Sequence, residues 1–188
     1  MWLLLVVLLL PQTVALPRVV IETDAGEIEV EIDTAHAPAT AANFLRYVEL
    51  GLYDDGRFHR AVRKEPDNQP QNEVKIEVIQ GAANSARRTE FPPAIPLERT
   101  SVTRLSHKDG TLSMARSGPD TGRSEFFICI GDQPELDFGG KRNADGQGFA
   151  AFGRVVRGMD IVRKIQAMPA NGQTLQPPVR IVRIRPAR

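Results

Sequence analysis

One short segment of the chain places a charged side chain where a substrate could meet it. The stretch GRFHRAV, residues 56–62, carries Phe58, His59 and Arg60 in succession. Alternation along a strand predicts that Phe58 and Arg60 share one face and that His59 lies on the other. A guanidinium has several fixed donors and stays charged, so Arg60 beside an apolar wall could hydrogen-bond a bound substrate. The alternative is a solvated arginine on an edge strand.

Other kinds of catalytic chemistry find little support in the sequence. The three histidines are far apart and have no nearby cysteine, so no metal site is expected. Ser113 and Ser124 do not lie in a nucleophile elbow. The glycine-rich residues 137–148 lack the pattern of a phosphate-binding loop and are interpreted as a long hairpin loop. We therefore expect neither a metal nor a cofactor.

Several strand-like segments carry side chains that could form a shallow apolar cleft around Arg60. The candidate walls are apolar or aromatic: Phe58, Val78, Phe126 or Phe127, Leu136 and Phe149. The candidate polar groups beside Arg60 are Gln80 and Glu125.

The elements that must position these residues are mostly short strands. Apolar residues alternate with polar ones in residues 26–32 and again in residues 74–78, which predicts strands with one buried face. Further strands are predicted from the stretches VVIE, GTLSMA, EFFICI, FAAFGRVV and VRIVRIR. Two helices are predicted, one beginning near Pro38 and ending at Gly51, the other near Asp160. Many short strands with two separated helices favour a mainly β fold, a closed antiparallel barrel, over βαβ units.

Composition limits the classes of function. The chain has 188 residues with 24 Lys and Arg against 23 Asp and Glu, so nucleic-acid binding is not expected. The apolar residues 1–15 predict a secretory signal peptide, with an uncleaved N-terminal anchor as the alternative. Residues 16–188 would then form one domain. The single cysteine, Cys129, lies in an apolar run and is expected to be a small buried side chain.

The order of several motifs resembles that of the cyclophilins, the peptidyl-prolyl cis-trans isomerases. The matching stretches are VVIETDAGEIEVEI, FHR, VIQGA, GTLSMARSGPDTGRSEFFI, ELD and FAAFGRVVRGMDIV. They span nearly all of residues 16–188, and the long stretch from GTLSMA to EFFI is highly specific. The resemblance implies a closed eight-stranded antiparallel β-barrel capped by two α-helices. The export signal and the charged insert at residues 63–75 look like a bacterial, exported branch of that family.

The resemblance also implies a set of site residues. The family's catalytic arginine falls on Arg60, and its substrate-binding positions fall on Val78, Gln80, Ala115, Arg116, Glu125, Phe127, Leu136 and Phe149. A pocket phenylalanine of the family falls near Glu77, and an aromatic residue of the family is replaced by Glu135. We expect Glu125 to pair with Arg60, and we expect cyclosporin-type ligands to bind weakly because Glu135 is not aromatic.

By this resemblance the protein would accelerate rotation about X-Pro peptide bonds, with proline-containing peptides and unfolded or partly folded proteins as its partners. We expect a periplasmic or secreted monomer that has no stable association with a membrane once its signal is cleaved. A non-catalytic peptide-binding or chaperone module on the same barrel is the main alternative, since a fold does not guarantee a function. A structural domain without a peptide cleft is a more distant alternative.

Overall fold

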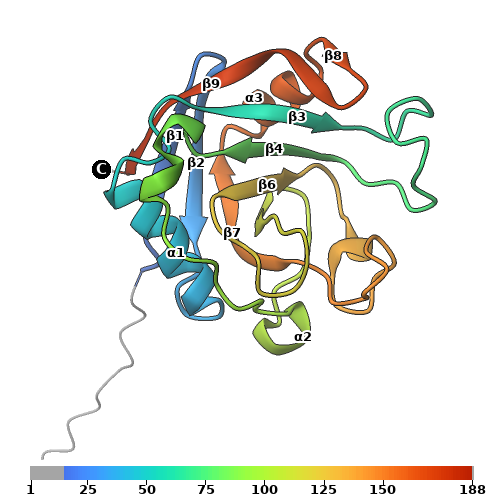
Figure 1. Ribbon diagram of the computed structural model, residues 1–188, viewed down its shortest axis with the longest axis horizontal. Coiled ribbons are helices and arrows are strands. Elements are labelled where there is room, and N and C mark those ends of the chain that lie inside the picture. The colour runs from blue at the N-terminus through green and yellow to red at the C-terminus, as the bar shows by residue number, and fades with distance from the viewer. Residues whose placement is uncertain (1–14, 188) are drawn as a thin grey trace, which may run out of the picture.

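A closed β-barrel forms the body of the protein in the computed structural model, which describes residues 15–187 (Figure 1). The strands follow the order β1-β2-β7-β5-β6-β4-β3-β9, and β1 pairs with β9 to close the barrel. All of these pairings are antiparallel, and the short β8 pairs only with β9. The strands are β1 (Arg18–Thr23), β2 (Gly26–Ile32), β3 (Gly56–Val62), β4 (Val78–Ala82), β5 (Thr111–Met114), β6 (Glu125–Cys129), β7 (Ala150–Arg157), β8 (Ala170–Asn171) and β9 (Thr174–Pro186). The expected barrel of eight strands is thereby confirmed.

Alternation within the strands fills the barrel interior. Ile28, Val30 and Ile32 of β2 point inward and are fully buried. Between them, Glu29 and Glu31 point outward and pair with arginines of neighbouring strands. The interior core therefore follows from the period of two that the sequence shows.

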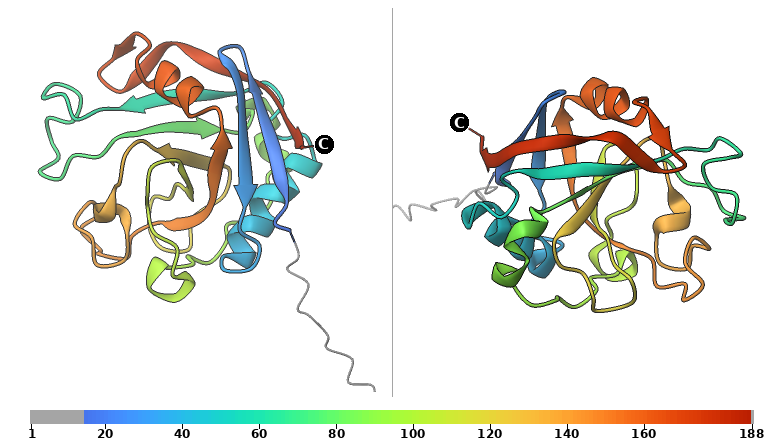
Figure 2. Two further views of the ribbon diagram at one scale, coloured as in Figure 1. Left: turned by 180° about the vertical axis from the view of Figure 1, so that it is seen from behind. Right: turned by 45° about the horizontal axis from the view of Figure 1, so that its top comes forward.

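Two larger helices pack against the barrel at different places, as the views in Figures 1 and 2 show: α1 (Pro38–Glu49) and α3 (Met159–Gln166). Pro38 occupies the first turn of α1, where its missing N–H costs no hydrogen bond. Phe44 of α1 lies edge-on to Phe126 of the barrel with ring centroids 5.5 Å apart. Three shorter helical segments lie in the connections: η1 (Ser85–Glu90), α2 (Thr100–Thr103) and η2 (Pro134–Leu136).

Long connections surround one side of the barrel. Residues 63–77 project beyond the sheet between β3 and β4, and residues 137–149 lead from η2 to β7 (Figure 1). The predicted strand at residues 74–78 is wrong in its first part, because β4 begins only at Val78. Within residues 15–187 no helix is long and apolar enough to cross a membrane. Nearly all of the predicted signal peptide, residues 1–14, lies outside the described residues.

A β-bulge in β3 changes the face on which Arg60 lies. Phe58 pairs with Gly81 of β4, but the next pair joins Arg60 to Gln80, so His59 is an extra residue. Phe58 is fully buried in the barrel core, whereas His59 and Arg60 are both partly exposed. The prediction that Phe58 and Arg60 share a face is therefore wrong, and Phe58 is a core residue and not a wall of the cleft.

Candidate active site

A cavity of about 290 Å³, lined by both apolar and polar side chains, lies on the outer face of the barrel, over β4 and β6. Val78 and Phe127 point outward because their neighbours Ile79 and Ile128 point into the core. Further apolar walls come from the connections: Ile76 just before β4, and Leu136 and Phe149 between β6 and β7. These side chains form a second apolar cluster, separate from the core of the barrel. The apolar part of this concave site is suited to a small ring-shaped group.

Arg60 lines this cavity and is held by two side-chain amides. Its Nε donates to Oε1 of Gln173 at 2.6 Å, and its Nη1 donates to Oε1 of Gln80 at 2.9 Å. Burial lowers the pKa of Arg60, and the charge of Glu125 acts in the opposite direction. Because an arginine in a protein keeps its proton, the cavity contains a fixed, partly desolvated positive charge.

Glu125 acts on Arg60 through Gln80 and does not touch it directly. The Nε2 of Gln80 donates to Oε2 of Glu125 at 2.6 Å, which leaves the other end of the same amide for Arg60. The same Oε2 lies 3.9 Å from Nε2 of His59. The expected ion pair between Glu125 and Arg60 is thus replaced by a relay, and this relay fixes which end of the amide faces the arginine.

A buried polar chain supports Phe127 from behind. The ring of His107 stacks against that of Phe127, with centroids 6.0 Å apart. The imidazole lies between Asp137, at 2.6 Å from Nδ1, and Ser113, at 2.9 Å from Nε2. Although Ser113, His107 and Asp137 are the residue types of a hydrolase triad, Ser113 is fully buried and no substrate could reach it. The chain therefore orients the aromatic wall.

The side chain of Arg116 braces the opposite wall. Its guanidinium forms two hydrogen bonds with the Asp145 carboxylate, at 2.7 and 2.9 Å, and a third with the carbonyl oxygen of Gly148. It also lies over the ring of Phe149 at 5.1 Å. The Arg116 side chain is only 3% exposed, and its hydrogen bonds lower the pKa of Asp145 to about 2. Arg116 thus holds the pocket wall formed by Phe149.

The remaining residues named from the sequence lie as follows. Ala115 borders the cavity, but its N–H donates to the Glu125 carbonyl at 2.9 Å and is not free for a peptide. The carboxylate of Glu135 points away from the cavity and accepts from the backbone N–H of Lys141 at 2.8 Å.

Glu77 lies 3.6 Å from Lys64 and does not line the cavity, where Ile76 is present instead. The apolar alternation of residues 74–78 is the signal that could have selected Ile76.

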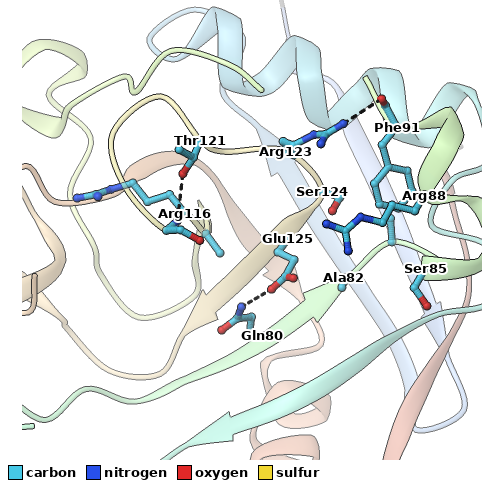
Figure 3. A pocket seen from close by; sticks show the side chains of 13 residues that line it. Gln80, Ala82, Ser85, Arg88, Phe91, Arg116, Thr121, Arg123, Ser124 and Glu125 are labelled. Atoms are coloured by element: carbon cyan, nitrogen blue, oxygen red, sulfur yellow. Dashed lines mark hydrogen bonds between the residues drawn. The ribbon is translucent and has the colours of Figure 1, made fainter. Parts of the chain in front are cut away.

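A second cavity of about 360 Å³ adjoins the first and shares Gln80, Ala115 and Arg116 with it. Figure 3 shows this cavity with the hydrogen bond between Gln80 and Glu125 at its floor. Arg88 and Arg123 lie toward its far side. The Gln80 amide, which orients Arg60, therefore lies between the two cavities.

The cavity also depends on residues that were not singled out from the sequence. Gln173 follows β8, and Arg142 lies in the connection to β7. The buried Asn68 and Gln69 belong to the charged insert. No sequence pattern marks these four residues, because only the folded chain brings Gln173 to Arg60, Asn68 to Gln173 and Gln69 to Arg142. Cys129, in contrast, is fully buried as expected, and burial raises the pKa of its thiol.

Comparison with known proteins agrees with this arrangement. The profile of the family described as "Cyclophilin type peptidyl-prolyl cis-trans isomerase/CLD" matches residues 18–186. A peptidyl-prolyl cis-trans isomerase of Acinetobacter baylyi is 34% identical over 151 residues, which cover 80% of this chain and 72% of the relative. Peptidyl-prolyl cis-trans isomerase B of Escherichia coli is 30% identical over 151 residues, which cover 80% of this chain and 84% of the relative.

The fold is also that of a solved structure. The crystal structure of a cyclophilin type peptidyl-prolyl cis-trans isomerase from Cryptosporidium parvum aligns with a TM-score of 0.72 at 21% identity, covering 92% of this chain and 98% of that one. The fold and the matched sequence define a cyclophilin-type β-barrel. The chain belongs to the cyclophilin-type peptidyl-prolyl cis-trans isomerase family and is a peptidyl-prolyl cis-trans isomerase.

Proposed function

We propose that the cavity beside Arg60 is where the X-Pro bond rotates, and that Arg60 stabilises the twisted amide. Rotation about a peptide bond faces a barrier of roughly 18–20 kcal/mol, because the planar amide has partial double-bond character. In the twisted amide the prolyl nitrogen becomes pyramidal and regains a lone pair. A guanidinium donor aimed at that nitrogen, or at the neighbouring carbonyl, would bind the twisted form better than either planar isomer.

The observation that carries this proposal is the position of Arg60 beside the apolar walls of the cavity, with two amide oxygens fixing its orientation. Phe127, Leu136 and Phe149 would surround the pyrrolidine ring and exclude water from the rotating bond. A structure of the Cryptosporidium relative was determined in the presence of the dipeptide Ala-Pro, which supports a proline residue as the occupant. No bond is broken in this scheme, so it needs no cofactor.

The test is a protease-free measurement of isomerisation, by NMR exchange spectroscopy on a short proline peptide. Arg60→Ala should lower turnover by orders of magnitude, while Arg60→Lys keeps the charge and loses the paired donors. The control is Arg46→Ala, because Arg46 lies exposed on α1, away from the cavity. If Arg60→Ala is folded and retains near-wild-type turnover, the catalytic assignment is wrong. A variant that still bound peptide without turnover would agree with it.

We further propose that the protein acts outside the cytoplasm, in the periplasm or after secretion, as a monomer on folding proteins. The support is the apolar stretch of residues 1–15, which ends in small residues. N-terminal sequencing of the protein recovered from fractionated cells tests this location. A mature chain beginning at Leu16 in the exported fraction would agree, and an intact Met1 in the cytoplasmic fraction would refute it.

A further inference from the structure

Two guanidinium groups besides that of Arg60 line the same cavity. Three arginines, Arg60, Arg116 and Arg142, lie around it, and none of the described residues that line it is a carboxylate. Arg116 is neutralised by Asp145, with which it forms two hydrogen bonds. Arg60 and Arg142 bond only to uncharged oxygens. The cavity therefore has an excess of positive charge that the described chain does not compensate within it.

The charged insert holds Arg142 in place. The Nη1 of Arg142 donates to Oε1 of Gln69 at 2.8 Å and to the carbonyl oxygen of Val74 at 2.6 Å. Gln69 is only 1% exposed, and its own amide nitrogen donates to the carbonyl oxygens of Arg63 and Ile76 at 2.6 and 2.8 Å. These hydrogen bonds hold the Gln69 amide in place. Arg142, which donates to that amide, therefore has a defined position at the cavity.

The remaining donors of Arg142 are available to a ligand. Within residues 15–187, its Nε and Nη2 have no hydrogen-bond partner. Burial, and after it the charge of Arg60, lower the pKa of Arg142. None of the described residues gives this guanidinium a carboxylate partner, and a partly desolvated cation gains most from a carboxylate with which it can form paired hydrogen bonds.

We propose that Arg142 is a specificity-determining residue, which favours X-Pro segments with a glutamate or aspartate next to the proline. This inference rests on the proposed function, since it requires the proline to occupy the cavity that Arg60 lines. With the proline ring against the edge-to-face pair of Phe127 and Phe149, a carboxylate side chain on an adjoining residue would lie near Arg142, which lines the same cavity. Arg60 would act on the rotating amide, and Arg142 would bind the neighbouring carboxylate.

The experiment compares matched tetrapeptides by NMR exchange spectroscopy. One pair has Glu or Gln before the proline, and a second pair has Glu or Gln after it. For the wild-type protein, kcat/KM for the Glu peptide should exceed that for the Gln peptide about fivefold at one of the two positions, as for a partly exposed ion pair of roughly 1 kcal/mol. In Arg142→Gln this ratio should fall to about one, and in Arg142→Lys it should be intermediate.

Lys141→Gln is the matched control, because it removes one positive charge from an exposed neighbour in the same connection. It should retain the wild-type ratio. Raised salt should lower kcat/KM for the Glu peptide and leave that for the Gln peptide little changed, because the Gln side chain is neutral. A wild-type ratio of about one at both positions, or an unchanged ratio in Arg142→Gln, overturns the proposal.

Failure of this inference is distinguishable from failure of the proposed function. The ratio of Glu to Gln peptides reports on Arg142, whereas turnover of a neutral peptide by Arg60→Ala reports on catalysis. If Arg60→Ala loses turnover and the ratio is one, only the specificity proposal is wrong. If Arg60→Ala retains turnover, the proposed function fails whatever the ratio.

Discussion

Gln173 offers a sharp test of how Arg60 is oriented. Its Oε1 accepts from the Nε of Arg60, and its Nε2 donates to the backbone oxygen of Asn68 at 2.6 Å. The same residue also accepts the N–H of Ala61 on its carbonyl at 2.8 Å. Gln173 thus connects the charged insert to the arginine, and Gln173→Met removes the side-chain amide with little change in shape.

The expected loss can be worked out from these contacts. A hydrogen bond to a charged group contributes roughly 1.5–3 kcal/mol when nothing replaces it. Here the second contact, from Gln80, remains, and water can reach the partly exposed Arg60, so about half of that contribution should be lost. A loss of roughly 0.75–1.5 kcal/mol in the transition state corresponds to a kcat/KM that is about four- to twelvefold lower. The decrease should fall mainly on kcat, because Gln173 does not line the cavity.

The assay is NMR exchange on a neutral proline peptide, with thermal unfolding as the check on folding. Gln176→Met is the matched control, since Gln176 is an exposed glutamine of the same hairpin. Gln173→Glu supplies an acceptor again and should recover most of the lost turnover. If kcat/KM of Gln173→Met stays within about twofold of that of the control, the orientation of Arg60 does not depend on this hairpin. A raised KM at unchanged kcat would instead assign Gln173 to peptide binding.

Three further outcomes are expected. Phe127→Ala should raise KM several-fold and lower stability by about 3 kcal/mol, since it removes a 4% exposed ring from the cavity wall, and an unchanged KM would contradict the pocket. The pKa of Asp145 is lowered to about 2 by Arg116, so its stabilising effect is complete above about pH 4 and is lost as pH falls toward 2. Urea unfolding should therefore show the difference between wild type and Asp145→Asn shrinking over that interval, and a constant difference would refute the pairing. Cyclosporin should bind weakly in a calorimetric titration because Glu135 is not aromatic, and tight binding would contradict that alignment.

The sequence predicted the elements well where a regular period governs them. The alternating residues of β2 and the spacing after Pro38 predict a strand and a helix that the structure contains. The same alternation gives a wrong prediction beyond residue 59. One inserted residue there exchanges the inward and outward directions of the side chains that follow it. Local patterns do not show where a bulge absorbs such an insertion.

Much of the candidate site lies beyond what such patterns contain. Arg60 and Gln80 were selected by their motifs, but Gln173 and Arg142 approach them from segments more than 60 residues further along the chain. The sequence shows that Glu135 stands where the family has an aromatic residue. The direction of the Glu135 side chain, toward the N–H of Lys141, depends on the path of the folded connection. Tertiary packing decides these placements, and one sequence alone does not record it.

The bulge at His59 also affects how β3 tolerates insertions and deletions. An ordinary strand assigns odd and even positions to opposite sides, so losing any one residue exchanges the core and surface roles beyond it. In β3 the side chains of Phe58 and Ala61 both belong to the core, with two outward residues between them. Loss of His59 would restore a plain alternation and keep Arg60 outside, whereas loss of Arg57 or Ala61 would not. The strand therefore has one position at which its length can change while the interior and the cleft keep their residues.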